Sequence, residues 1–221
     1  MALSAAVKVR ILMLLLVTGC TAKPAKAPPP RDAGVRESPA IVFLGDSLTA
    51  GRGLAEADAV PAKIAERVEA AGLDYRVINA GRSGDTTAGG LTRLDWYLRD
   101  TVRLKVLVIG LGSNDAMRGQ PIESIESNLE KIVDTTRAKV PDAKILLWSM
   151  KTFPNMGEAY REDYEQVFAR VAASKKITLI PFPLADVAGR PELNQPDGIH
   201  PTKEGTALVA ERIWATLKAE L

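Results

Sequence analysis

Hydrophobic residues occur along this chain in two alternating patterns. Short apolar runs, each ending close to a glycine, serine or proline, lie at 41–44, 76–79, 106–109, 145–148 and 177–180. Runs of nearly continuous hydrophobicity, rather than an alternation of apolar and polar residues, are typical of strands buried on both faces of a sheet. This first pattern therefore predicts buried β-strands.

The segments between these runs carry apolar residues at helical spacing. The longest stripes are Ile122, Ile125, Leu129, Ile132 and Val133, with Pro121 suited to the first turn, and Tyr160, Tyr164, Val167, Phe168 and Val171. Shorter ones are Ile64 and Val68, Leu91, Leu94 and Leu98, and Val209, Ile213 and Leu217. These stripes are expected to face the core. Five strand–helix units predict an α/β protein: a single domain over residues 38–221, with a five-stranded parallel sheet and helices on both faces.

The first 37 residues follow neither pattern. Lys8 and Arg10 precede an apolar run at 11–17, which is too short to span a bilayer but suits a signal peptide. The sequence Leu16-Val17-Thr18-Gly19-Cys20 resembles the lipobox of bacterial lipoproteins, in which the cysteine becomes the N-terminus and carries lipid. Residues 1–19 are therefore expected to be a lipoprotein-type signal peptide, with Cys20 as the lipidated residue.

Residues 20–37 are rich in proline and alanine and are expected to form an extended linker between a membrane and the domain. This arrangement implies a bacterial cell envelope, with the domain on the extracytoplasmic, periplasmic side. An alternative is an ordinary signal peptide cleaved after Ala25-Lys26-Ala27, which would release a secreted soluble protein.

Charge and composition narrow the classes of partner. The chain has 29 Lys and Arg against 27 Asp and Glu, and two of the cations lie within residues 1–19. The remainder is formally neutral, so no nucleic-acid partner is expected. Cys20 is the only cysteine and His200 the only histidine, which leaves no set of soft ligands for a metal. Without a G-x-G-x-x-G or Walker motif either, we expect neither a metal nor another cofactor.

Four chemically suggestive segments fall after predicted strands or before the last helix. Ser47 follows the first strand, Gly81 the second and Asn114 the third, while Asp197 and His200 precede the last helix. The carboxyl ends of parallel strands share one edge, where ligands bind in open α/β sheets. Each residue also has a structural interpretation: Ser47 as a helix N-cap, Gly81 as a turn glycine, Asn114 as an Asx turn. Their convergence on one edge favours a catalytic site.

The spacing of Asp197 and His200 suits the orientation of a base. Three residues apart in a turn, the carboxylate can reach Nδ1 of the imidazole and leave Nε2 free for a serine hydroxyl. Pro201 disfavours a helical conformation for His200, which should therefore lie before the last helix.

These residues resemble the four sequence blocks of the SGNH (GDSL) hydrolases. The blocks are 45–48 (Gly-Asp-Ser-Leu), 79–86, 112–115 (Gly-Ser-Asn-Asp) and 197–201 (Asp-Gly-Ile-His-Pro). The similarity is greatest to the bacterial thioesterase I/protease I/lysophospholipase (arylesterase) group, which implies a flavodoxin-like fold. It also implies that Ser47 is the nucleophile, His200 the base and Asp197 its partner. The backbone amides of Ser47 and Gly81 and the side chain of Asn114 would form the oxyanion hole. No G-x-S-x-G is present, which argues against an α/β-hydrolase.

The expected function is that of a serine esterase acting on lysophospholipid, aryl or thioester-type acyl substrates through a Ser47 acyl-enzyme. Apolar residues after the third and fourth strands could wall an acyl groove or simply cap the core: Leu111, Met117, Met150, Phe153, Pro154 and Met156. Alternatives are a carbohydrate or cell-envelope O-acetyl esterase or acyltransferase of the same fold, and a non-catalytic lipid- or glycan-binding lipoprotein.

Overall fold

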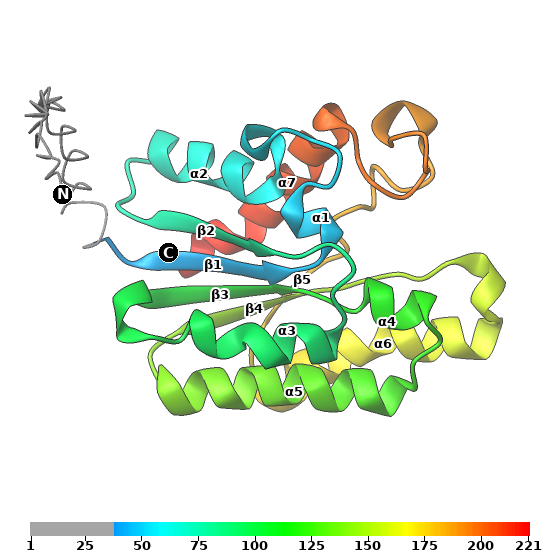
Figure 1. Cartoon of the computed structure of the whole chain (residues 1–221), viewed down its shortest axis with the longest axis horizontal. Coiled ribbons are helices and arrows are strands. Elements are labelled where there is room, and N and C mark those ends of the chain that lie inside the picture. The colour runs from blue at the N-terminus through cyan, green and yellow to red at the C-terminus, as the bar shows by residue number, and fades with distance from the viewer. Residues whose placement is uncertain (1–37) are drawn as a thin grey trace, which may run out of the picture. The chain divides into compact units, whose positions relative to one another are not determined.

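The computed structural model describes residues 38–221, so the predicted signal peptide, Cys20 and linker lie outside the described residues. Within this range the five predicted strands form one parallel sheet (Figure 1). They are β1 (Ala40–Gly45), β2 (Arg76–Gly81), β3 (Leu104–Gly110), β4 (Lys144–Trp148) and β5 (Thr178–Ile180). Their order is β2-β1-β3-β4-β5, the flavodoxin-like arrangement. The register pairs Gly45 with both Gly81 and Gly110, so three strands end at the same level.

Helices cover both faces of the sheet, as predicted. Figure 1 shows α2 (Val60–Ala70) and α7 (Lys203–Leu217) on one face, and α3 (Thr87–Arg93), α5 (Ile122–Lys139) and α6 (Glu158–Lys175) on the other. Two short helices, α1 (Ser47–Ala50) and α4 (Ser113–Met117), follow β1 and β3 directly. Short 3-10 turns lie at Glu56–Asp58, Leu94–Trp96, Asp100–Val102, Pro154–Met156, Pro191–Leu193 and Lys218–Glu220.

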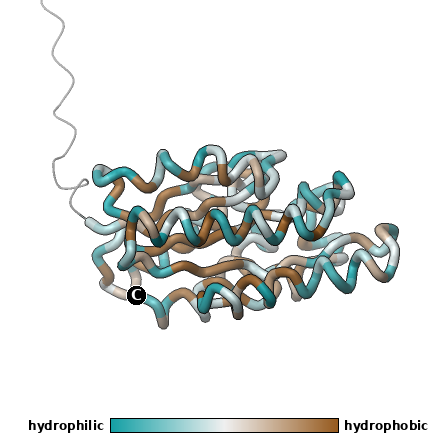
Figure 2. Tube along the Cα trace, turned by 90° about the horizontal axis from the view of Figure 1, so that it is seen from below, coloured by the Kyte–Doolittle hydropathy of each residue, from teal (hydrophilic) through white to brown (hydrophobic). Residues whose placement is uncertain are grey.

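The core lies between the sheet and the two helical layers. All six residues of β1 are buried, and the hydrophobic colour in Figure 2 runs along the strands and the inner sides of the helices. The α5 stripe is buried as its spacing predicted, with Ile125, Leu129, Ile132 and Val133 fully enclosed. Burying apolar surface in this way is the main stabilising term of folding, which accounts for the two hydrophobic periods in the sequence.

Two helix boundaries differ from the prediction. The stripe Leu91, Leu94 and Leu98 is not one helix: α3 ends at Arg93, and Leu94–Trp96 form a 3-10 turn. Leu94 and Leu98 are nevertheless buried, because the turn keeps them directed at the core. Pro121 is the N-cap of α5 rather than part of its first turn.

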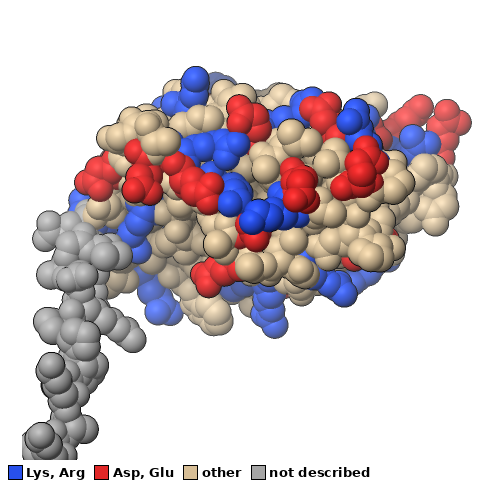
Figure 3. Space-filling view, turned by 90° about the horizontal axis from the view of Figure 1, so that it is seen from above, with Lys and Arg blue, Asp and Glu red and all other residues tan. Residues whose placement is uncertain are grey.

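The surface of the described domain is mixed in charge. On the face seen in Figure 3, acidic and basic side chains are interspersed. One ion pair, Arg67 with Glu211, joins α2 to α7 with an Nη2–Oε2 distance of 2.7 Å. Among residues 38–221, none of the helices has both the length and the apolar character needed to cross a membrane.

Candidate active site

Ser47 lies at the sharp turn between β1 and α1. Asp46, not Ser47, caps α1, because the Asp46 carboxylate accepts a hydrogen bond from the Leu48 amide at 3.0 Å. Ser47 is instead the first helical residue, and its own amide has no partner within the helix. The preceding Gly45 has no room for a side chain, since a Cβ there would lie 1.9 Å from Oγ1 of Thr49. The turn thus fixes the Ser47 hydroxyl at the carboxyl edge of the sheet.

His200 lies in a loop that is held at several points before α7 begins. The His200 carbonyl accepts from the Gln195 amide at 2.7 Å, and Asn194 forms a bridge with Pro201. The Asn194 side chain also donates to the carbonyl of Val187 at 2.7 Å. α7 starts at Lys203, so His200 precedes the helix, as Pro201 suggested. The imidazole is therefore carried by a loop with little freedom.

Ser47, His200 and Asp197 form a continuous hydrogen-bonded row. Nε2 of His200 lies 2.8 Å from Oγ of Ser47, and Nδ1 lies 2.7 Å from Oδ2 of Asp197. The backbone amides of His200 and Ile199 each donate to Oδ1 of Asp197 at 3.0 Å. These amide bonds, together with the imidazole, hold the pKa of Asp197 well below its usual range. Asp197 is thus a carboxylate that fixes the imidazole with Nδ1 protonated and Nε2 facing the serine.

Asn114, in α4, points its side-chain amide toward the turn that carries Ser47. Its Nδ2 donates to the Asp85 carbonyl at 2.9 Å and lies 3.2 Å from Oδ2 of Asp46. Burial raises the pKa of Asp46 to about 7, with a smaller contribution from the charge of Asp115. The neighbouring Asp115 carboxylate accepts from the amide and hydroxyl of Thr87, which fastens α3 to α4.

The Gly81 amide, expected to be an oxyanion-hole donor, already has a hydrogen-bond acceptor in the structure. It donates to Oδ1 of Asn79 at 2.9 Å, and a Cβ on Gly81 would lie 2.2 Å from the Ala50 nitrogen. Gly81 is therefore required by the close approach of α1 to β2. Gly84, three residues on, has a φ of 84°, and among the described residues its amide donates no hydrogen bond. The sequence carried no signal that separates Gly84 from Gly81, because both are glycines of the block 79–86.

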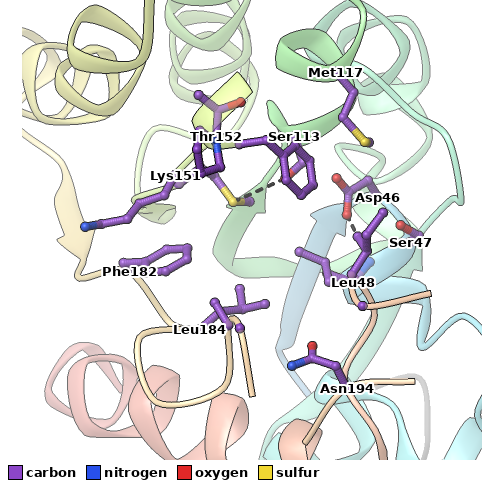
Figure 4. A pocket seen from close by; sticks show the side chains of 17 residues that line it. Asp46, Ser47, Leu48, Ser113, Met117, Lys151, Thr152, Phe182, Leu184 and Asn194 are labelled. Atoms are coloured by element: carbon purple, nitrogen blue, oxygen red, sulfur yellow. Dashed lines mark hydrogen bonds between the residues drawn. The ribbon is translucent and has the colours of Figure 1, made fainter. Parts of the chain in front are cut away.

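An apolar cavity of about 460 Å³ opens beside Ser47. Figure 4 shows Ser47, Leu48 and Met117 at one end and Lys151 and Phe182 at the other, with Leu184 between them. Four of the residues expected to wall a groove line it: Met117, Met150, Phe153 and Pro154. Leu111 does not, because it is fully buried beneath Gly90, and Met156 is not among the lining residues either.

The residues of the opposite wall of this cavity were not predicted from the sequence. Phe182 and Leu184 follow β5, and Asn194, Gly198 and Ile199 come from the loop that carries His200. The rule that ligands bind at the carboxyl ends of parallel strands applied to β5 as well and could have found the first two. Within residues 38–221 no three His, Cys, Asp or Glu side chains cluster so as to hold a metal ion.

A serine, an imidazole and a carboxylate in one row, at the carboxyl edge of a flavodoxin-like sheet, define a serine hydrolase. The sequence model of the GDSL-like lipase/acylhydrolase family matches residues 43–208. The chain belongs to this family.

Curated relatives support the same assignment. Esterase TesA of Pseudomonas aeruginosa is 39% identical over 178 residues, which cover 80% of this chain and 87% of the relative. Thioesterase 1/protease 1/lysophospholipase L1 of Escherichia coli K12 is 32% identical over 171 residues, covering 77% and 79%. The chain is accordingly a GDSL-type serine esterase, a carboxylic ester hydrolase.

Solved structures agree with the fold. A crystal structure of TesA superposes with a TM-score of 0.78 at 38% identity, covering 82% of this chain and 99% of that one. The psychrotrophic esterase EstA from Pseudoalteromonas sp., in a structure inhibited by monoethylphosphonate, gives a TM-score of 0.76 at 30% identity. It covers 81% of this chain and 97% of the other.

Proposed function

We propose that the chain hydrolyses acyl esters through a covalent intermediate on Ser47, with His200 as general base and Asp197 as its orienting partner. The single observation that carries this assignment is the row of contacts from Ser47 Oγ to His200 Nε2 at 2.8 Å and from Nδ1 to Asp197 at 2.7 Å. As the hydroxyl oxygen of Ser47 attacks the ester carbonyl, its proton passes to Nε2. The positive charge on the imidazole is then stabilised by the Asp197 carboxylate.

The negative charge on the carbonyl oxygen needs donors at the same edge of the sheet. We assign these to the backbone amide of Ser47, the Nδ2 group of Asn114 and the backbone amide of Gly84, in place of Gly81. The Gly84 amide is supported by its lack of an acceptor among the described residues, whereas the single N–H of Gly81 is engaged with Asn79. Asn114 has two N–H groups, and it would donate to the oxyanion by giving up the longer of its two contacts, that with Asp46 at 3.2 Å. Donors that are already fixed in place stabilise an oxyanion at little reorganisation cost.

Collapse of the tetrahedral intermediate releases the alcohol or thiol, which takes its proton from Nε2 of His200. A water molecule then gives a proton to Nε2 and attacks the acyl-enzyme. As the bond between the acyl carbon and the Ser47 oxygen breaks, this oxygen takes the proton back from Nε2, which frees the carboxylic acid and restores Ser47. No cofactor enters either half of this cycle.

The substrate class follows from the cavity. A space of about 460 Å³ lined by Leu48, Met117, Met150, Phe182 and Leu184 is large enough for an acyl chain of several carbons. Flexible methionines and aromatic rings suit an apolar chain, whereas an acetyl group would leave most of this surface unfilled. The names of the relatives, esterase, thioesterase and lysophospholipase, are consistent with an acyl substrate of this kind.

For its location, we infer a lipid anchor at Cys20 and an extracytoplasmic domain, which rests on the signal-like segment and the lipobox-like sequence. The test is the mass of the N-terminal peptide after expression in a bacterium. A diacylated or triacylated Cys20 supports the anchor, and an N-terminus at Pro28 would show ordinary cleavage and a soluble product.

The catalytic assignment is tested by covalent labelling. A fluorophosphonate should add one phosphonyl group to the tryptic peptide that contains Ser47, and peptide mass spectrometry locates the adduct. Exposed serines elsewhere lack an imidazole, so Ser174 on α6 is an internal control. An adduct on any other serine, or no adduct on the folded protein, would overturn the assignment.

A further inference from the structure

A buried ion pair lies behind the proposed oxyanion site. Nε of Arg93, at the end of α3, lies 2.6 Å from Oδ2 of Asp85, in the loop that follows β2. Only 6% of the Arg93 side chain and 10% of the Asp85 side chain are exposed. The catalytic steps described above use neither side chain, so their burial needs another explanation.

The same guanidinium reaches the turn that carries the nucleophile. Nη2 of Arg93 donates to the carbonyl of Gly45 at 2.9 Å, and the Arg82 amide donates to the same carbonyl at 3.0 Å. Gly45 is the last residue of β1 and stands two residues before Ser47. The position of the Ser47 turn is therefore linked directly to the loop 82–85.

The backbone of Asp85 completes the link on the other side. Its carbonyl accepts the Nδ2 group of Asn114 at 2.9 Å, while its side chain is held by Arg93. One arginine thus connects the turn before Ser47 with the residue that orients Asn114. Gly84, the remaining proposed donor, is the immediate neighbour of Asp85.

Stability alone is a poor explanation for this pair. Taking two charges out of water is unfavourable, and well-packed apolar residues often replace a buried ion pair without loss of stability. The helix also gives up stability to accommodate it, because a Cβ on Gly89 would lie 2.9 Å from Oδ1 of Asp85. Glycine inside a helix is destabilising relative to alanine.

From these contacts we propose that Arg93 is a positioning residue, which sets the distance between the Ser47 turn and the oxyanion donors Gly84 and Asn114. The proposal rests on the roles assigned to those residues above. Arginine suits the task because its planar fork binds two acceptors in different directions, which an ammonium group on a flexible stem does not do.

The test compares Arg93→Gln and Arg93→Lys in residues 21–221, which contain the whole described domain. Thermal melts establish that each variant is folded at the assay temperature, and steady-state kinetics on a p-nitrophenyl ester give kcat and KM separately. Arg67→Gln is the matched control, because it breaks an ion pair on the α2–α7 face, away from the site. Ser47→Ala is measured in parallel to test the underlying mechanism.

We expect Arg93→Gln to lower kcat by about 10²-fold with KM almost unchanged, since a misplacement of about 1 Å in a catalytic group costs that much. Arg93→Lys should recover part of the loss, because the charge opposite Asp85 is kept while the bond to Gly45 is lost. Arg67→Gln should retain normal kcat.

Normal kcat in folded Arg93→Gln would overturn the proposal. The proposal also fails if both Arg93 variants are unfolded, because the Arg93–Asp85 ion pair would then serve the stability of the fold. If Ser47→Ala remains active, the proposed mechanism fails instead, and the two failures are thereby distinguished.

Discussion

Nδ2 of Asn114 lies 3.2 Å from Oδ2 of Asp46 and 2.9 Å from the carbonyl of Asp85, so the side-chain amide is aimed by two acceptors on different segments. Asp46 belongs to the nucleophile turn and Asp85 to the loop after β2. The bond to Asp46 is the longer of the two. If Asn114 donates to the oxyanion, as proposed, we expect this longer bond to be the one that is exchanged during the reaction.

Replacing Asn114 by alanine should lower kcat by about 10²–10³-fold, the usual effect of losing one oxyanion-hole donor. KM should change little, because the donor acts mainly on the transition state. Steady-state kinetics on a p-nitrophenyl ester measure both. Asn128→Ala is a suitable control, since its amide donates to Thr87 at 3.1 Å and lies outside the proposed machinery. Equal kcat in the two variants would contradict the role of Asn114.

Asp46 makes the free energy of unfolding depend on pH. Burial raises its pKa from the ordinary 3.8 to about 7, so between these values the folded state holds a proton that the unfolded state has lost. The free energy of unfolding therefore falls as pH rises from about 4 to 7. Urea melts at several pH values should show this fall in the wild type relative to Asp46→Asn, in which the group does not titrate. If the free energy of unfolding depends on pH in the same way in the wild type and in Asp46→Asn, then the pKa of Asp46 is not raised on folding.

The cavity beside Ser47 should set the length of the acyl chain. Leu184→Trp places a bulky indole ring in the wall of the cavity. The kcat/KM for octanoyl and longer esters should therefore fall by at least about 10-fold, while hydrolysis of acetyl esters should persist. Leu208→Trp, at an exposed position on α7, is the control. A uniform loss across all chain lengths would show damage to the site rather than a shortened pocket.

The central strands β1, β3 and β4 were predictable because burial on both faces leaves a nearly continuous apolar run, and the main helices because burial on one face leaves a helical stripe. The edge strands β2 and β5 are only partly buried, and their runs include Arg76, Asn79 and Thr178.

Ser47, Asn114 and His200 were predictable as site candidates because chain order alone places their segments at one sheet edge. The core position of Leu111 was not predictable. Its burial depends on Gly90, which lets α3 approach within contact of the Leu111 side chain. In the sequence, an apolar residue that follows a strand looks the same whether it lines a cavity or lies in the core.

For a related reason, the sequence could not show whether Gly81 or Gly84 supplies the backbone amide of the oxyanion hole. Both are glycines in one block, and they differ in whether the amide already has an acceptor. That acceptor is the side chain of Asn79, an exposed residue of β2 whose rotamer cannot be deduced from its spacing in the sequence. The buried Arg93–Asp85 pair was likewise hidden, because two charged residues eight positions apart usually lie in solvent.

The most direct test of the account is hydrolysis of p-nitrophenyl esters from acetyl to palmitoyl by residues 21–221, with Ser47→Ala measured beside the wild type. We expect activity that rises above that on acetyl as the acyl chain fills the cavity, and a loss of about 10⁴–10⁶-fold in kcat for Ser47→Ala at unchanged melting temperature. Near-normal activity in Ser47→Ala would contradict the proposed nucleophile. A maximum at acetyl would contradict the assignment of the cavity to an acyl chain.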